Sequence, residues 1–340
     1  MAARSVSSSN TNSSSDNTNP TSLNSDAPTI AGSQEFQADL IKSYLNLEML
    51  DTNLFRAKDL MGGVITSPWV YGGQVIGQAL VAASKTVDTQ FHPHSLHSYF
   101  IKAGDKTKPI LYMVDPVRNG RSFCTRFVKA IQNGQTICTV ELSFHREEED
   151  SIQHQWKLPD VSLPEELEDG DLLMQRVIDD PNTSPELRTE TQARLLNYPT
   201  TFRIRPDAYL RLKAVPPRLL LWIKSKSLIG EDWRLNHCVA AFISDAFMIG
   251  TALLPHVGMV FSLDHSIWIH RHKFRIDDWM LYETESPIAC GSRAMIHGKL
   301  WDRSGNLVLS TAQEGLIRAK LPDKTPPRAD KPDPKRAYME

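Results

Sequence analysis

The chain has 340 residues, which is enough for two domains of ordinary size. Hydrophobic residues make up 41% and charged residues 23%, so the chain can bury sizeable cores, and a net charge of −2 does not indicate a nucleic-acid partner. No apolar run is long enough for a membrane span, and residues 1–30 lack the apolar segment of a secretory signal.

Both ends of the chain are predicted to be disordered tails. Of the first 30 residues, 18 are Ser, Asn or Thr, and such a segment buries too little apolar surface to offset its ordering entropy. The last 20 residues contain five prolines and nine charged residues. We therefore expect tails over residues 1–36 and 321–340, with the folded part between them.

The first folded block is predicted over residues 37–146. It contains an apolar stretch rich in small residues, "YGGQVIGQALVAASK" (71–85), which is typical of a helix buried on nearly all sides. Three strand-like runs follow, joined by hairpin turns such as "QNGQ". They are "LHSYFIKAGD" (96–105), "PILYMVDPVRNGRS" (109–122) and "NGQTICTVELSF" (133–144). An acidic, proline-containing stretch, residues 147–205, is predicted to be a linker.

The second block, residues 206–320, repeats this order. A long apolar helix is expected at "HCVAAFISDAFMIGTALL" (237–254), and the strands are "DHSIWIHRHK" (264–273), "WMLYETESPIACGSR" (279–293) and "SGNLVLSTAQEGL" (304–316). The spacing between matching positions is 168 from His97 to His265, 170 from Leu111 to Leu281 and 172 from Thr139 to Thr311. Such a slow drift indicates a duplicated domain. One helix followed by antiparallel strands predicts an α+β fold in each block, a sheet curled around a buried helix, and hence a double hot-dog.

An acid and a histidine are adjacent at Asp264 and His265, within the strand-like run "FSLDHSIWIH" (261–270). Neighbouring side chains on a strand point to opposite faces, so the two cannot easily form a catalytic pair. The same alternation puts Ser262 on the face opposite His265. We expect His265, which matches His97 in the first block, to be structural.

These stretches together resemble the acyl-CoA thioesterase II family, which includes peroxisomal acyl-CoA thioesterases. The resemblance covers about residues 45–318 and is carried, in order, by "YGGQVIGQALVAA", "HSLHSYFIKAGD", "ISDAFMIGTALLPH", "SLDHSIWIH" and "STAQEGLIR". It implies hydrolysis of acyl-CoA to fatty acid and CoA. The family's catalytic Asp, Thr or Ser, and Gln fall on Asp245, Ser262 and Gln313, and this chain has Ser where some members have Thr.

A thioester is already an activated acyl group, so this chemistry requires neither a metal nor another cofactor. A carboxylate can accept a proton from the attacking water, and a hydroxyl and an amide can hold that water. Backbone N–H groups at the start of a helix can stabilise the oxyanion that develops. An acid among Ile, Phe and Ala, such as Asp245, calls for a functional reason because burying an unpaired charge is costly.

Two other functions remain open at this point. A hot-dog enoyl-CoA hydratase would need the pattern D-x-N-x-x-H, and "SDAFMIG" lacks its Asn and His. A non-catalytic acyl-CoA-binding protein would not need the intact set of three site residues. The repeat also pairs Gln78 with Asp245, His94 with Ser262 and Glu141 with Gln313, so a second site with Glu141 as its base is not excluded.

Metal, partners and location follow from weaker signals. His92, His94 and His97 have spacing seen in zinc sites, but no Cys or carboxylate cluster accompanies them, so no metal site is expected. The four cysteines show no CxxC spacing and are expected to be reduced thiols.

The resemblance implies an acyl-CoA substrate and a homo-oligomer, without nucleic acid or a membrane span. It suggests a peroxisomal location, although the chain ends in "RAYME" rather than an S-K-L type signal, with the cytosol as the alternative.

Overall fold

The computed structural model describes residues 41–62, 67–205, 216–252 and 257–319. The two predicted tails lie outside these residues. In the first half, helix α2 (Gly72–Ser84) is enclosed by strands on both sides of it in the chain. These strands are β1 (Glu48–Asp51), β2 (Leu54–Ala57), β3 (Phe91–Phe100), β4 (Ile110–Asn119), β5 (Phe123–Gln132) and β6 (Gln135–Arg146).

The second half has the same plan with additional elements at its start. Its helices are the 3₁₀ turn η1 (Pro164–Glu166), α3 (Gly170–Asp179), α4 (Pro185–Asn197), α6 (Trp233–Ser244) and α7 (Met248–Thr251). Its first strands are β7 (Glu168–Asp169), β8 (Thr200–Ile204) and β9 (Arg218–Ser225). The strands after α7 are β10 (Val257–Ser262), β11 (Asp264–Ile269), β12 (Met280–Cys290), β13 (Arg293–Trp301) and β14 (Leu307–Ala319).

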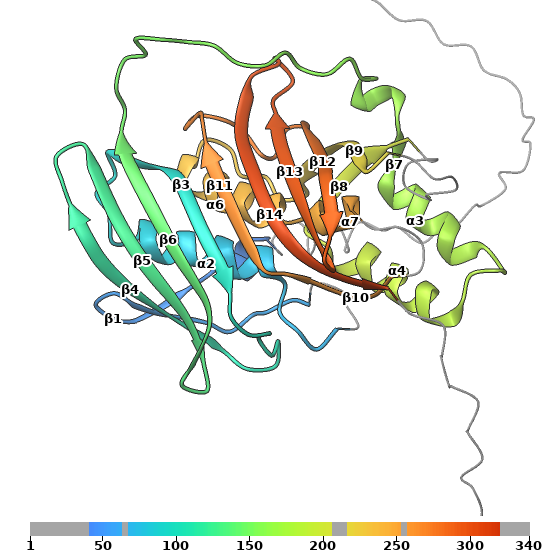
Figure 1. Ribbon diagram of the computed structural model, residues 1–340, viewed down its shortest axis with the longest axis horizontal. Coiled ribbons are helices and arrows are strands. Elements are labelled where there is room, and N and C mark those ends of the chain that lie inside the picture. The colour runs from blue at the N-terminus through green and yellow to red at the C-terminus, as the bar shows by residue number, and fades with distance from the viewer. Residues whose placement is uncertain (1–40, 63–66, 206–215, 253–256, 320–340) are drawn as a thin grey trace, which may run out of the picture.

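All strands join one antiparallel sheet, in the order β1-β2-β4-β5-β6-β3-β11-β14-β13-β12-β9-β8-β7, with β10 also paired to β14. Figure 1 shows α2 and α6 on the same side of this sheet, behind its central strands. The buried apolar residues of both helices share one core with the inward-facing strand residues. This is the α+β architecture expected for two hot-dog units, fused into a single sheet.

The two halves join where β3 pairs with β11. Ser98 lies opposite His265, and both side chains are buried, whereas His97 is exposed and lies opposite Ser266. The sequence repeat aligns His97 with His265, but the two side chains lie on opposite faces of the sheet. The β3–β6 pairing has a register irregularity between Pro93 and Ser95, and a shift of one residue moves a side chain to the other face of a strand.

Helices α2 and α6 approach each other closely because α2 carries glycine at the contact. A Cβ atom on Gly73 would collide with the carbonyl oxygen of Phe242, and one on Gly77 would lie 3.1 Å from that of Cys238. Tyr71 at the start of α2 also donates a hydrogen bond to the Phe242 carbonyl, at 3.0 Å. The "YGGQVIGQ" stretch is therefore required for contact between the halves.

Residues 147–205, predicted to be a linker, carry several structural elements. The chain after β6 crosses the outer face of the second half, where the indole of Trp222 donates to the carbonyl of Ser162 at 2.9 Å. A second small core forms there around Trp222, Leu281 and Trp301, against Leu158, Val161 and Leu167. Strand β8 then pairs with β9, so this segment contributes to the second half of the sheet.

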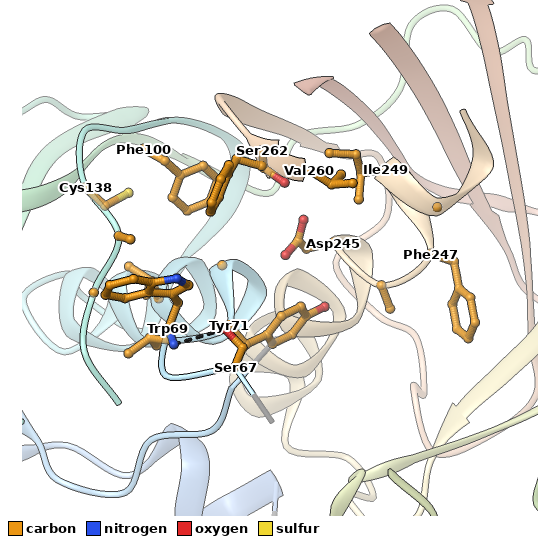
Figure 2. Close-up of a pocket in the computed structure, with 18 of the residues that line it drawn as sticks. Ser67, Trp69, Tyr71, Phe100, Cys138, Asp245, Phe247, Ile249, Val260 and Ser262 are labelled. Carbon is orange, nitrogen blue, oxygen red and sulfur yellow. Dashed lines mark hydrogen bonds between the residues drawn. The ribbon is translucent and has the colours of Figure 1, made fainter. Parts of the chain in front are cut away.

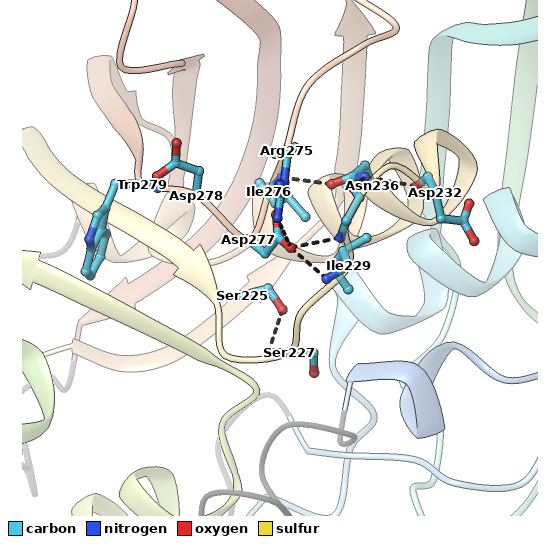
Figure 3. Close-up of polar contacts among 11 residues, drawn as sticks. Ser225, Ser227, Ile229, Asp232, Asn236, Arg275, Ile276, Asp277, Asp278 and Trp279 are labelled. Carbon is cyan, nitrogen blue, oxygen red and sulfur yellow. Dashed lines mark hydrogen bonds and ion pairs between the residues drawn. The ribbon is translucent and has the colours of Figure 1, made fainter. Parts of the chain in front are cut away.

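The start of α6 is anchored by a polar network around Asp277 (Figure 3). The Asp277 carboxylate accepts hydrogen bonds from the backbone N–H groups of Ile229 and Gly230 at 2.7 and 2.9 Å. It also forms an ion pair with Arg275 at 3.0 Å. Asn236 in the first turn of α6 accepts the backbone N–H of Ile276 at 2.9 Å. These bonds hold two loops together and set where α6 begins.

Candidate active site

The central helix of the second half is interrupted at Asp245. The sequence predicted one helix over residues 237–254, but α6 ends at Ser244, and Asp245 is its C-cap residue. Phe247 adopts a left-handed conformation, with φ of 64°, before the short helix α7. This break corrects the expectation of a mid-helix acid, because it turns Asp245 out of the helix and toward the first half (Figure 2).

The Asp245 carboxylate is held by one donor from each half of the chain. Its Oδ2 accepts the backbone N–H of Gly73 at 2.8 Å, in the first turn of α2. Its Oδ1 accepts the side-chain amide of Gln313 on β14 at 2.6 Å. A helix N-terminus carries partial positive charge and free N–H groups, so it favours a carboxylate at this place.

Gln313 links Asp245 to Ser262. Its Nε2 atom, which has two hydrogens, also donates to Ser262 Oγ at 3.0 Å. Its side chain is fully buried and does not reach the cavity described below, whereas Asp245 and Ser262 both line it. The structure therefore brings the three sequence-predicted site residues together, with the amide behind the other two.

Ser262 and His265 lie on the same side of the sheet, contrary to the sequence expectation. Strand β10 ends at Ser262 and β11 begins at Asp264, and Leu263 between them bonds to both Glu314 and Phe100 through its backbone. This interruption removes the strict alternation that the expectation assumed. Asp264 and His265 do not form a pair, as predicted: Asp264 accepts the backbone N–H of Glu314 at 2.7 Å.

A cavity of about 770 Å³ opens in front of Asp245 and Ser262. Figure 2 shows its walls, which come from both halves. On the first-half side the cavity is lined by Trp69, Phe100 and Cys138 among others, and on the second-half side by Phe247 and Ile249. The volume lies within the range of small-molecule sites, and the mostly apolar walls suit an acyl chain.

Further residues of the cavity wall were missed by the sequence reasoning. Met174, Arg194, Tyr198 and Phe202 come from the segment predicted to be a linker. Gly72, at the first position of α2, also lines the cavity beside Asp245. The pair of glycines opening an apolar helix was a usable signal for a close approach, but no local pattern marked the residues of α3 and α4.

The first-half counterparts of the site residues do not assemble a second site. Gln78 is fully buried, donates to the Tyr44 carbonyl at 2.6 Å and accepts from the Tyr112 hydroxyl at 2.6 Å. His94 contacts the Ser143 hydroxyl, and Glu141 is exposed on the outer face. None of Gln78, His94 and Glu141 is among the described residues that line the cavity.

The described part of the chain contains no group of three His, Cys, Asp or Glu side chains that could hold a metal ion. It likewise contains no helix that is long and apolar enough to cross a membrane. All four cysteines are free thiols, and burial raises the pKa of Cys138 and Cys238 to about 12.

Two family models match the chain in tandem. Residues 64–145 match the acyl-CoA thioesterase N-terminal domain, and residues 168–317 match the acyl-CoA thioesterase C-terminal domain. Among similar proteins, acyl-coenzyme A thioesterase 8 of Rattus norvegicus is 43% identical, over 87% of this chain and 94% of its own. Peroxisomal acyl-coenzyme A thioester hydrolase 1 of Saccharomyces cerevisiae is 28% identical, over 82% of this chain and 94% of its own.

Solved structures resemble the chain in the same way. The acyl-CoA thioesterase II TesB2 of Mycobacterium marinum is 33% identical, with a TM-score of 0.65 over 82% of this chain and 98% of its own. A hot-dog protein of Alicyclobacillus acidocaldarius is 15% identical, with a TM-score of 0.63 over 83% of this chain and 98% of its own. The second likeness confirms the hot-dog fold.

Proposed function

This chain belongs to the acyl-CoA thioesterase II family, and from that premise we propose that it hydrolyses acyl-CoA to fatty acid and CoA with Asp245, Ser262 and Gln313 as its catalytic group. The residue assignment rests on two hydrogen bonds that the Gln313 side-chain amide donates. Gln313 Nε2 reaches Asp245 and Ser262 at 2.6 and 3.0 Å, at the wall of the cavity between the halves.

In the proposed reaction, a water molecule lies between Asp245 and Ser262. Asp245 accepts one proton from this water as a general base, while Ser262 Oγ accepts a hydrogen bond from its other O–H group. The water oxygen attacks the thioester carbonyl carbon, and the carbonyl becomes an oxyanion. Collapse of this intermediate breaks the C–S bond, and the CoA thiolate takes the proton back from Asp245.

Gln313 has a separate role in this proposal. Its two amide hydrogens are committed to Asp245 and Ser262, so it orients both acceptors rather than binding the water itself. Holding the base and the hydroxyl in one arrangement lowers the entropic part of the barrier. We place Gln313 as a residue that positions the other two.

The backbone N–H of Gly72 is the proposed donor to the oxyanion. Gly72 opens α2, lines the cavity beside Asp245, and belongs to the helix turn whose N–H groups have no intrahelical acceptor. Its neighbour Gly73 already donates to Asp245. The first half would thus supply the oxyanion donor, and the second half the base.

Release of free CoA thiol from a series of acyl-CoA substrates tests the activity. We expect thiol release with the purified chain, and the chain-length series identifies the preferred substrate. A hydratase would add water to an enoyl-CoA without releasing thiol, and a binding protein would retain acyl-CoA unchanged. Either of those two results would contradict the proposed reaction.

Two further properties are proposed from family membership. We propose a homo-oligomer, because Tyr99 and Trp268 at the central seam are 51% and 38% exposed and present apolar surface that a second copy could cover. Light scattering that gives only the 38.3 kDa monomer at micromolar concentration would contradict this.

We also propose a peroxisomal location, which is stated in the name of the yeast relative. A fluorescent fusion to the full chain, imaged with a peroxisomal marker, tests the location. A diffuse cytosolic signal would favour the alternative.

A further inference from the structure

The backbone just before Asp245 is held by side chains from two neighbouring strands. Ser244 is the last residue of α6 and is nearly fully buried. Its carbonyl accepts a hydrogen bond from the Tyr282 hydroxyl on β12. Its own hydroxyl donates to the Ala241 carbonyl at 2.8 Å and lies 2.9 Å from His265 Nε2 on β11. The carbonyl and the hydroxyl of Ser244 are therefore bonded to residues that do not line the cavity.

These contacts bear on the tautomer of His265. The Ser244 hydroxyl has a single hydrogen, which goes to Ala241, and this assignment makes His265 Nε2 the donor of the second bond. His265 Nδ1 is buried and has no hydrogen-bond partner among the described residues. Burial lowers the pKa of His265, which favours the neutral imidazole.

Tyr282 is equally constrained. Its side chain is fully buried, and burial raises the pKa of its phenol far above the ordinary value, so the hydroxyl stays protonated and donates. The ring fits because Gly298 on the neighbouring strand β13 has no side chain, and a Cβ there would lie 3.0 Å from the Tyr282 hydroxyl oxygen. The missing side chain at Gly298 thus leaves room for the Tyr282 ring, whose hydroxyl reaches the end of α6.

We propose that Tyr282 and His265 are positioning residues for the hydrolytic reaction, acting through Ser244 on Asp245. Helix α6 stops one residue before the base, and a helix end has carbonyl groups without intrahelical partners. Tyr282 satisfies one of them and holds the peptide from which Asp245 projects. This inference rests on the proposed role of Asp245 as the base.

The first half contains a matched arrangement that lacks the base. Tyr112 on β4 occupies the position that the repeat aligns with Tyr282, since Leu111 matches Leu281. Tyr112 is also fully buried, but its hydroxyl donates to the Gln78 side chain at 2.6 Å, in the middle of α2. Removing either hydroxyl deletes one buried hydrogen bond to a central helix, and only Tyr282 acts on the residue before Asp245.

The test compares Tyr282→Phe, Tyr112→Phe and Asp245→Asn in the full-length chain, by thiol release and by urea unfolding. We expect both tyrosine variants to have lower urea midpoints. Tyr282→Phe should lower kcat by about ten- to a hundred-fold with KM nearly unchanged, because a displaced base costs rate rather than binding. Tyr112→Phe should keep the wild-type kcat.

The outcomes separate this inference from the proposed function. Equal kcat values for the two tyrosine variants, with Asp245→Asn inactive, would overturn the positioning role and leave the base assignment intact. Wild-type turnover by Asp245→Asn would instead overturn the base assignment itself.

A smaller change decides the question if Tyr282→Phe does not fold. Ser244→Ala removes the hydroxyl that His265 contacts, and we expect a several-fold lower kcat at unchanged KM. Its matched control is Ser84→Ala, at the last residue of α2, which should keep the wild-type kcat. A wild-type kcat for folded Ser244→Ala would contradict the inference.

Discussion

At the scale of single residues, the candidate site consists of a carboxylate held only by neutral donors. Asp245 accepts from the Gly73 backbone and from the Gln313 amide, and none of the ion pairs among the described residues includes it. Each acceptor oxygen therefore has a fixed donor, while no Lys or Arg in the described part of the chain forms an ion pair with the carboxylate. A carboxylate so placed can accept a proton from water while keeping its orientation.

Asp245→Asn removes the proton acceptor while keeping the shape of the side chain. We expect thiol release to fall by about 10²–10⁴-fold, which corresponds to about 3–5 kcal/mol of barrier. Stability should decrease slightly, because the asparagine amide cannot accept from both Gly73 and Gln313. Gln78→Asn, in the first half, is the control and should retain most activity. Near-normal turnover by folded Asp245→Asn would contradict the assignment.

Ser262 contributes a hydroxyl that accepts from Gln313. Ser262→Ala deletes one hydrogen bond to the proposed water, and we expect kcat to fall by roughly three- to ten-fold, since one such bond contributes about 1 kcal/mol. Ser262→Thr keeps the hydroxyl and should retain activity. Equal kcat values for the Ala and Thr variants would show that the hydroxyl has no part in the reaction.

At the scale of elements, α6 determines where Asp245 lies, because the helix ends at Ser244 and starts beside the loops that Asp277 holds together. Burial alone would raise the pKa of Asp277, but the Arg275 guanidinium and the backbone N–H groups of Gly230 and Ile229 outweigh it and lower the pKa to about 2. The anchor and the site are thus connected by a single rigid helix.

Asp277→Ala should therefore destabilise the fold by about 2 kcal/mol, because two backbone N–H groups lose their acceptor. The folded-state pKa lies below the unfolded value, so the stabilisation by Asp277 is present above pH of about 4 and is lost as the pH falls toward 2. Urea unfolding at several pH values measures this. An unchanged midpoint at neutral pH would rule out the anchor.

At the scale of the whole molecule, the two halves are held together at both ends of the β3–β11 seam. The site lies at one end, where Asp245 meets Gly73. Near the other end, His92 of the first half stacks on His272 of the second at 4.6 Å, and His237 on α6 packs beside them. His272 Nε2 also lies 3.3 Å from a carboxylate oxygen of Glu147.

This histidine cluster predicts a loss of stability in acid. Burial, with a smaller contribution from His92, lowers the pKa of His237 from 6.5 to about 3. The unfolded chain therefore binds a proton more readily, and stability should decline below pH of about 6.5 by at most about 1.4 kcal/mol per unit, until pH 3. His237→Phe should flatten this dependence in urea unfolding. An unchanged pH profile in the variant would contradict the role of His237.

Much of this protein was determined by its sequence alone. The apolar helix, the strand runs and their repeated order predicted two α+β units, because burial periodicity is set by near neighbours along the chain. Asp245, Ser262 and Gln313 could be chosen as site residues from the family resemblance. The sequence did not show that their side chains lie in contact.

Only the tertiary structure decided which face each residue occupies and what Asp245 contacts. The break at Leu263 put Ser262 on the face that the sequence had not predicted, because local alternation does not record such an interruption. Likewise, the bond from Gly73 to Asp245 joins residues 172 positions apart, and the Ser244 carbonyl at the end of α6 accepts from Tyr282, 38 positions away. Contacts of that separation arise from packing between distant segments, which no short stretch of sequence encodes.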